Sequence, residues 1–126
     1  MKRVYIALAM LALIAIACFY SLHKVNRAYY TLEDKIELVY SALDQNDRQQ
    51  LGKNVDDLCA YWKDEERSLV HFVRHAQIDE ITKSIARLPS FAKYGDYADL
   101  SAELNCIRLQ MENIRDSEPP TWNNLL

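Results

Sequence analysis

The stretch VYIALAMLALIAIACFYSL, from Val4 to Leu22, decides how the rest of the chain is organised. It contains no charged residue, no proline and no glycine. As a helix it reaches roughly 28 Å, close to the thickness of the hydrocarbon core of a bilayer. This apolar stretch therefore predicts an N-terminal transmembrane helix that carries the remaining, more polar residues as a separate domain.

The residues that flank the apolar stretch bear on its orientation. Lys2 and Arg3 precede it, and the positive-inside rule places such residues in the cytoplasm. Lys24 and Arg27 follow it, so the charge asymmetry is small. We expect an uncleaved signal anchor at residues 1–24 that crosses the cytoplasmic membrane once, with the N-terminus inside and the C-terminal domain outside.

Two other interpretations of the apolar stretch stay open. In a cleaved signal peptide, Ala15-Ile16-Ala17 would supply the small residues of the cleavage site, but the apolar run continues beyond it. In a lipoprotein, Cys18 would carry the lipid, although Phe-Tyr follows it in place of a polar tether. Cys18 also suits a membrane helix as a small apolar residue. The length of the run favours the anchor.

The rest of the chain is acidic and rich in helix-forming residues. Four of the fifteen Lys and Arg lie before Ala28 and all eighteen Asp and Glu lie after it, so residues 28–126 carry a formal charge of −7. This charge disfavours nucleic acid and anionic lipid as partners. Two glycines and three prolines leave long uninterrupted stretches that favour helix. Cys59 and Cys106 lie far apart in the expected layout, so we predict no internal disulfide.

The first helix of the domain is predicted at Val25–Leu43, directly continuing the membrane helix. Its apolar residues recur every three or four positions, which places them on one helix face. They are Val25, Tyr29, Leu32, Ile36, Val39, Tyr40 and Leu43. The segment Asp44-Gln-Asn-Asp47 then breaks the pattern, and Asp47 with Gln50 has the spacing of a capping box that opens the next helix.

The middle of the chain, from Asp47 to Gly95, allows two arrangements. Apolar residues up to Ala76 share one face, whereas those from Ile81 to Ala92 lie about 100° further round the helix. The helix-forming composition of Lys63–Ser68 favours one long helix, which Gly95-Asp96 should end. A break near residues 63–68 would instead produce four pieces of a length suited to an antiparallel four-helix bundle.

The last helix begins after Asp96, and its apolar residues again follow steps of three and four. They are Tyr97, Leu100, Leu104, Ile107, Met111 and Ile114. Pro119-Pro120 prevents the helix from continuing into the tail. The predicted fold is all-α, with an N-terminal transmembrane helix followed by an antiparallel helical hairpin or bundle of three to four helices. The bundle spans residues 25–116, and a non-helical tail spans residues 117–126.

Catalytic motifs are missing from the sequence. It has no GxSxG, P-loop or GxGxxG pattern and no Cys–His nucleophile arrangement. The carboxylate clusters Asp56-Asp57 and Asp64-Glu65-Glu66 lie on solvated helix surface, where adjacent groups lack the separate environments that acid–base pairs need. We therefore expect no enzyme activity, no cofactor and no small-molecule substrate.

Polar residues in the middle of the chain form a candidate interaction face. On a continuous helix His71, His75, Asp79 and Thr82 would lie together, away from both apolar faces. The first three follow i, i+4, i+8 spacing, which can ligate zinc, but no HExxH motif accompanies them. A packed or solvated face is the simpler interpretation. The tail could cover this face, or a partner could, with Trp122 as an aromatic anchor.

From Trp62 onward the chain resembles a family of small bacterial proteins known as domain of unknown function 4363. The resemblance lies in Trp62, His75-Ala-Gln-Ile-Asp79-Glu-Ile81, Ser84-Ile-Ala-Arg-Leu88, Glu103-Leu104 and Asn124-Leu125-Leu126. It implies a membrane-anchored helical protein of Gram-positive bacteria that acts beside another membrane protein, and it implies no activity. The family often carries a histidine late in the last helix, where this chain has Asn113.

These observations predict a membrane-anchored helical module that binds another membrane or extracytoplasmic protein. The anchor is the apolar stretch, and the candidate interaction face consists of His71, His75, Asp79, Thr82 and Trp122. The alternative is an extracytoplasmic sensor or a ligand- or metal-binding helical domain. Melting that depends on stoichiometric zinc would favour the alternative, because a ligand of the native state raises its stability.

Overall fold

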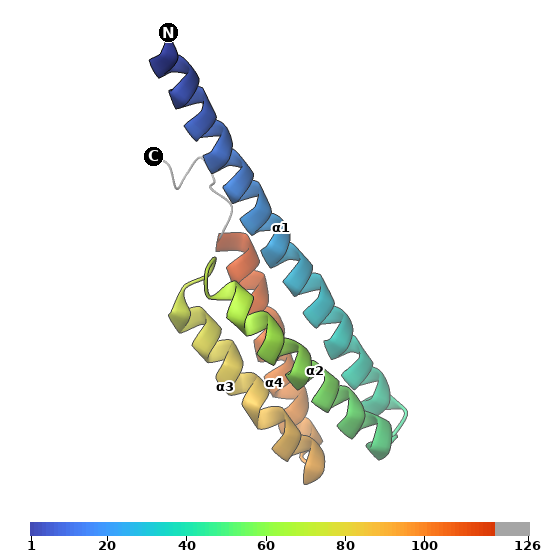
Figure 1. The fold of residues 1–126 in the computed structure, drawn as a ribbon. Coiled ribbons are helices and arrows are strands. Elements are labelled where there is room, and N and C mark those ends of the chain that lie inside the picture. Colours follow the sequence, from blue (N-terminus) through green and yellow to red (C-terminus); the bar gives the residue numbers. More distant parts are fainter. Residues whose placement is uncertain (118–126) are drawn as a thin grey trace.

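A computed structural model describes residues 1–117 of the chain as four helices (Figure 1). They are α1 (Lys2–Asp44), α2 (Arg48–Leu69), α3 (His75–Lys93) and α4 (Tyr97–Ser117). The predicted all-α fold, with a long apolar N-terminal helix followed by a helical bundle, is confirmed. The predicted tail, apart from Ser117, lies outside the described residues.

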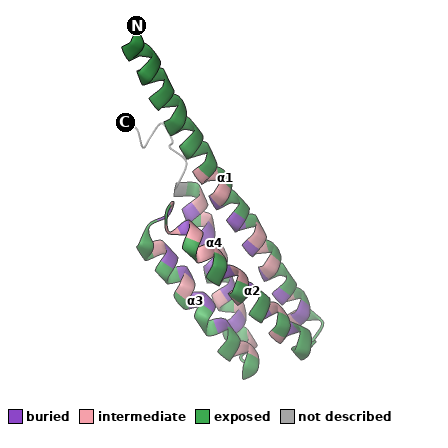
Figure 2. Ribbon diagram, viewed as in Figure 1, coloured by how far each residue is buried: buried purple, intermediate pink, exposed green. Residues whose placement is uncertain are grey.

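Helix α1 runs for 43 residues without a break. Every residue from Met1 to Tyr20 is exposed, whereas the second half of α1 packs into the bundle (Figure 2). Its buried residues follow the predicted spacing; they are Val25, Ala28, Tyr29, Leu32, Ile36, Val39 and Ala42. The first half is long and apolar enough for a membrane span, a test that a signal sequence also passes. The predicted direct continuation from the apolar stretch into the bundle is confirmed.

The turn between α1 and α2 forms where the apolar pattern stops. Asn46 adopts a positive φ of 58°, a conformation that asparagine tolerates better than most residues. Asp47 then caps α2, because its carboxylate accepts a hydrogen bond of 3.1 Å from the backbone N–H of Gln50. The side chain of Gln50 does not complete the capping box; it donates to Asn54 at 2.8 Å.

The prediction of one long helix through the middle of the chain is wrong. Residues 63–68 are helical, as their composition indicates, but α2 ends at Leu69, and the turn Val70–Arg74 leads into α3. A continuous helix would hold the two apolar faces about 100° apart. Folding back lets both faces bury against the same core, and Leu69 and Val73 on either side of the reversal are themselves buried. Gain from burial therefore outweighs local helix propensity.

The four helices form an antiparallel bundle in which each packs against its neighbour in sequence and α4 returns against α1. The core consists of apolar residues from all four helices. Gly95, with a φ of +72°, reverses the chain between α3 and α4, as predicted. The turn between α2 and α3 and the end of α4 lie at the end of the bundle from which the apolar half of α1 projects (Figure 1).

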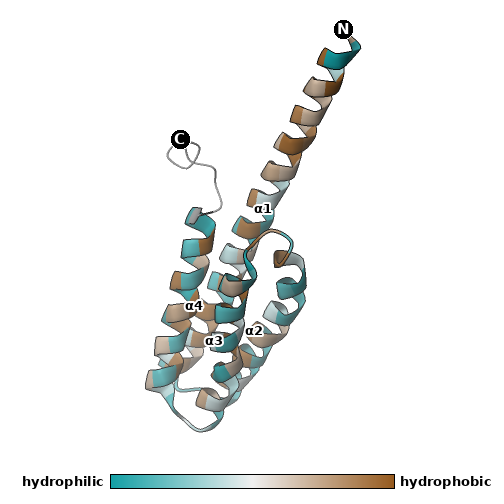
Figure 3. Ribbon diagram, turned by 90° about the vertical axis from the view of Figure 1, so that its left-hand side faces the viewer, coloured by the Kyte–Doolittle hydropathy of each residue, from teal (hydrophilic) through white to brown (hydrophobic). Residues whose placement is uncertain are grey.

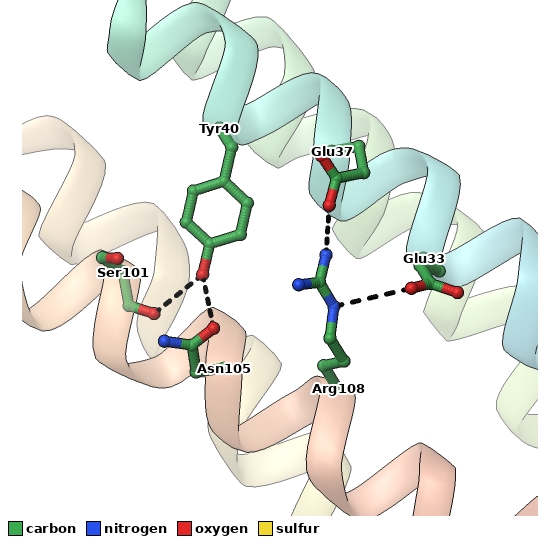
Figure 4. A network of polar contacts seen from close by, with 6 residues as sticks. All are labelled: Glu33, Glu37, Tyr40, Ser101, Asn105 and Arg108. Carbon is green, nitrogen blue, oxygen red and sulfur yellow. Dashed lines mark hydrogen bonds and ion pairs between the residues drawn. The ribbon is translucent and has the colours of Figure 1, made fainter.

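Polar contacts fasten α4 to the second half of α1 (Figure 4). The hydroxyl of Tyr40 shares its proton between the backbone carbonyl of Ser101, at 3.2 Å, and Oδ1 of Asn105, at 2.9 Å. The guanidinium of Arg108 lies between two carboxylates of α1: it pairs with Glu37, and its Nε is 3.8 Å from Glu33. These contacts join residues more than 60 positions apart. They hold α4 against the second half of α1.

Candidate interaction face

The structure places His75 and Asp79 together on the outer surface of α3. His75 is the first residue of the helix and Asp79 lies one turn later, so the two side chains project from the same face. Both are exposed. The inner face of α3 is held in the core by other residues, which are Ile78, Ile81, Ser84, Ile85 and Leu88. The pair is thus available for contact from outside the bundle; we call it the His75–Asp79 face.

Two other members of the predicted candidate face lie elsewhere. His71 is exposed but belongs to the turn Val70–Arg74, because the chain reverses before α3 begins. Thr82 is half-buried against α2, where its hydroxyl accepts a 3.0 Å hydrogen bond from Nε1 of Trp62. The prediction that all four residues share one face of a single helix is therefore wrong. Trp122 lies outside the described residues.

A groove between α3 and α4 adjoins the His75–Asp79 face. It encloses about 270 Å³ and is lined by Ala76, Gln77, Glu80, Gln110 and Asn113. The first three of these residues follow or flank His75 and Asp79 along α3, and the other two come from the last turns of α4. We call this cavity the α3–α4 groove. Sequence reasoning missed it because its two walls are far apart along the chain.

One polar atom at the α3–α4 groove has no partner within residues 1–117. The side-chain carbonyl oxygen of Gln110 is buried and accepts no hydrogen bond from them. Leaving a buried acceptor unsatisfied costs about 1–3 kcal/mol. Glu80 at the rim is largely exposed, with Lys83 3.8 Å away. The groove is thus lined by one carboxylate and three amide side chains beside Ala76.

The structure also bears on metal binding. Across the described part of the chain, no three His, Cys, Asp or Glu side chains gather closely enough to hold a metal ion. The predicted zinc-like spacing of His71, His75 and Asp79 required one helix, and the turn at Val70–Arg74 separates the first of them from the others.

A larger cavity lies at the opposite end of the bundle. It encloses about 480 Å³ between the first turns of α2 and the α3–α4 connection. Its charged and aromatic lining includes Arg48, Asp56, Lys93, Tyr94 and Tyr97. We call it the distal cavity, because its lining comes from the start of α2 and the end of α3, whereas His75 and Asp79 lie at the start of α3. It brings charges of both signs together with two tyrosine rings.

The fold and the candidate face define an antiparallel four-helix bundle that continues directly from an exposed apolar helix. Within this class, the chain belongs to the family described as Domain of unknown function (DUF4363), whose family model matches residues 19–125. The match takes in the end of the apolar stretch and the whole bundle. Comparisons with curated proteins and with solved structures give no match.

Most of the residues that carry the family resemblance have a structural role. Trp62, Ile81, Leu88 and Leu104 are core residues that are at most 2 % exposed. Arg87 and Glu103 form an ion pair of 2.9 Å between α3 and α4. His75 and Asp79 differ from these residues, since neither is buried and the side chain of neither forms a hydrogen bond or ion pair with another described residue. The described contacts of the bundle therefore do not explain these two polar members of the motif.

Proposed function

We propose that this protein is a single-pass, membrane-anchored helical module that binds another membrane or extracytoplasmic protein outside the cytoplasmic membrane. The His75–Asp79 face and the α3–α4 groove form the contact surface. One observation carries this proposal: residues of the family motif that the core does not use lie exposed beside a groove with an unsatisfied acceptor. The role requires neither catalysis nor a cofactor.

The location of this surface favours a partner that is itself at the membrane. His75 begins α3 at the end of the bundle from which the apolar half of α1 projects, and Gln110 and Asn113 lie near the same end of α4. Lys2 and Arg3 before the apolar stretch support a cytoplasmic N-terminus. With that orientation, the surface lies just outside the bilayer, where the extracellular part of a neighbouring membrane protein can reach it.

The chemistry of the surface also limits the partner. Asp79 and Glu80 offer carboxylates, and His75 offers an imidazole. A complementary segment would bring Arg, Lys or Asn side chains whose N–H groups donate to these acceptors, since charge-assisted hydrogen bonds are the stronger kind. An acidic partner segment would be repelled.

Site-specific photocrosslinking in native membranes tests the proposal. A benzophenone amino acid placed at Ala76 should crosslink a partner, whereas the same probe at Asp57, an exposed position on α2, should not. In the Ala76 probe strain, the double substitution His75→Ala with Asp79→Ala should reduce the adduct at least several-fold. The matched control, Lys53→Ala with Asp57→Ala, changes another exposed i, i+4 pair and should leave the adduct intact. Equal adducts from both probe positions would contradict the proposed surface.

The distal cavity favours a second candidate function, an extracytoplasmic ligand sensor. Arg48 and Lys93 could hold an anionic group there while Tyr94 and Tyr97 contact an apolar part. Gly52 also lines the cavity and has open space where a side chain would be added. Under this alternative, a small anionic ligand raises the melting temperature of the detergent-solubilised protein, and Gly52→Leu abolishes that rise. Stoichiometric zinc serves as the separate test of metal binding.

A further inference from the structure

The turn between α2 and α3 is held beside the last turn of the apolar stretch. The rings of Tyr20 and Phe72 meet edge to face with their centroids 5.9 Å apart. One turn further along α1, Nζ of Lys24 lies 3.3 Å from Oε1 of Glu65. Ser21 and Leu22 are half-buried at this junction. The turn is thus held level with Tyr20 along the axis of α1.

The continuity of α1 converts this contact into a position relative to the bilayer. No residue between Lys2 and Asp44 leaves the helix, so there is no flexible linker between the apolar stretch and the bundle. If the stretch from Val4 to Leu22 spans the hydrocarbon core, Tyr20 lies at the outer boundary, where aromatic residues are enriched. Phe72 then lies within about one helical turn, roughly 5 Å, of the same boundary.

The side chains of the turn match the chemistry of that boundary. Phe72 and Val70 are only half-buried, and Figure 3 shows the turn as a partly hydrophobic segment beside α1. His71 and Arg74 are exposed, and Arg67 is exposed on the last turn of α2. Neither arginine has an ion-pair partner within the described residues. Guanidinium groups bind phosphate oxygens in a bidentate manner, and lipid phosphates lie at this depth.

We propose that the turn Val70–Arg74 inserts into the headgroup layer of the bilayer as a second membrane contact, with Phe72 and Val70 against the acyl boundary and with Arg67 and Arg74 on the phosphates of anionic phospholipids. The proposal rests on the proposed membrane anchoring. The net charge of −7 for residues 28–126 disfavours anionic lipid overall, but these two arginines, which have no ion-pair partner within residues 1–117, lie next to the turn at the end from which the apolar half of α1 projects. With two membrane contacts, the apolar stretch and the turn, the tilt and rotation of the bundle relative to the bilayer are fixed.

The test measures how deeply the turn enters the bilayer in the full-length protein. Cys18, Cys59 and Cys106 are first replaced by Ala, and a nitroxide label is then attached at His71→Cys. The labelled protein is reconstituted into vesicles of phosphatidylglycerol and phosphatidylcholine. A label in the bilayer collides with oxygen more often than with a water-soluble nickel complex. We expect this preference to be at least several-fold stronger at position 71 than for a label at Asn46→Cys in the opposite turn. Equal preferences at the two positions would overturn the proposal.

Lipid composition and arginine variants test the charged half of the contact. The preference at position 71 should weaken in pure phosphatidylcholine and also with Arg67→Gln and Arg74→Gln, whereas Arg48→Gln at the far end of the bundle should have no effect. A preference that none of these changes alters would overturn the phosphate contact. Flotation of the same vesicles measures membrane anchoring separately. Protein that does not float with the vesicles contradicts the proposed anchoring. Protein that floats but carries a water-exposed label at position 71 contradicts only the insertion of the turn.

Discussion

Trp62 and Cys59 lie one turn apart on α2, and both face α3. The side chain of each has its hydrogen-bond acceptor on α3. The indole of Trp62 is 2 % exposed, and its N–H finds an acceptor in Thr82. The thiol of Cys59 is half-buried, with its Sγ 3.7 Å from the carbonyl oxygen of Ile85. A buried polar group without a partner is costly, so these residues make the α2–α3 contact sensitive to small changes.

Removal of the hydroxyl of Thr82 should destabilise the bundle. Thr82→Val keeps the shape of the side chain but leaves the buried indole N–H of Trp62 without an acceptor, at a cost of about 1–3 kcal/mol. Urea or thermal unfolding of the detergent-solubilised full chain measures the loss. Thr82→Ser retains the hydroxyl and is the matched control. If the valine and serine variants unfold alike, the hydrogen bond contributes nothing measurable.

The thiol of Cys59 should make stability depend on alkaline pH. Burial, together with the nearby carboxylate of Asp56, raises the pKa of Cys59 from its ordinary 9.0 to about 11. The unfolded chain therefore loses this proton at a lower pH than the folded chain, and stability falls as the pH rises from about 9 to 11. The wild type should lose more melting temperature between about pH 8 and about pH 10 than Cys59→Ala does. Cys106→Ala, at an exposed cysteine, should follow the wild type.

At the scale of the elements, the bundle is closed by packing α4 against both α3 and α1. The inner face of α4 consists of residues that are at most 2 % exposed; they are Leu100, Leu104, Ile107, Met111 and Ile114. The ion pairs of Arg108 with Glu33 and Glu37 lie at the edge of this contact and are partly exposed, so they contribute less than the apolar face does. Burial along α4 therefore holds the four helices together, and the polar contacts select its register.

A charge placed on the inner face of α4 should open the bundle. Leu104 is fully buried, so Leu104→Asp puts an unpaired carboxylate in the core, which is among the most destabilising single changes. Cys106→Asp introduces the same side chain two residues away at an exposed position and should change the melting temperature little. Circular dichroism melts compare the two variants. Similar melts would contradict the assignment of the inner face.

At the scale of the whole molecule, α1 has two roles. Its first half is the apolar stretch, and its second half is one of the four helices of the bundle. The two halves share one helix, so the end of the bundle from which the apolar half projects is the end that would face a membrane in either orientation. The turn between α1 and α2, with Asn46 at its tip, is at the end remote from the apolar half (Figure 1). It offers a reporter of topology that is far from the proposed contact surface.

The proposed topology predicts labelling of that turn from outside the cell. In a Cys106→Ser background, Asn46→Cys should react with a membrane-impermeant thiol reagent in intact cells, because the side chain is exposed and the proposed topology puts the domain outside. Cys59 reacts slowly, since its raised pKa keeps the thiol protonated at neutral pH. Labelling that appears only after lysis would reverse the assigned orientation.

The mode of attachment gives a further prediction. If the apolar stretch spans the bilayer, Cys18→Ser should leave the protein in the membrane fraction with an unchanged mass apart from the substitution. In the lipoprotein alternative, the same change would remove an attached lipid and release the protein into the medium. Mass spectrometry of the purified protein and fractionation of the cells distinguish the two.

Local patterns in the sequence were enough to predict the long apolar N-terminal helix, the inward faces of the helices, the cap at Asp47 and the reversal at Gly95. Each depends on residues within a few positions of one another. The two divergent apolar faces allowed a break near residues 63–68 as an alternative, but the sequence did not decide for it or place the reversal at Val70–Arg74. Lys63–Ser68 favours helix, and only the shared burial of the two faces makes the chain turn. Because of that turn, His71 lies at the end of the bundle and Thr82 packs against Trp62. It also left His75 and Asp79 beside a groove whose far wall, Gln110 and Asn113, comes from a helix much later in the chain. Tertiary packing decided these features, since burial depends on which surfaces meet and not on the order of the residues.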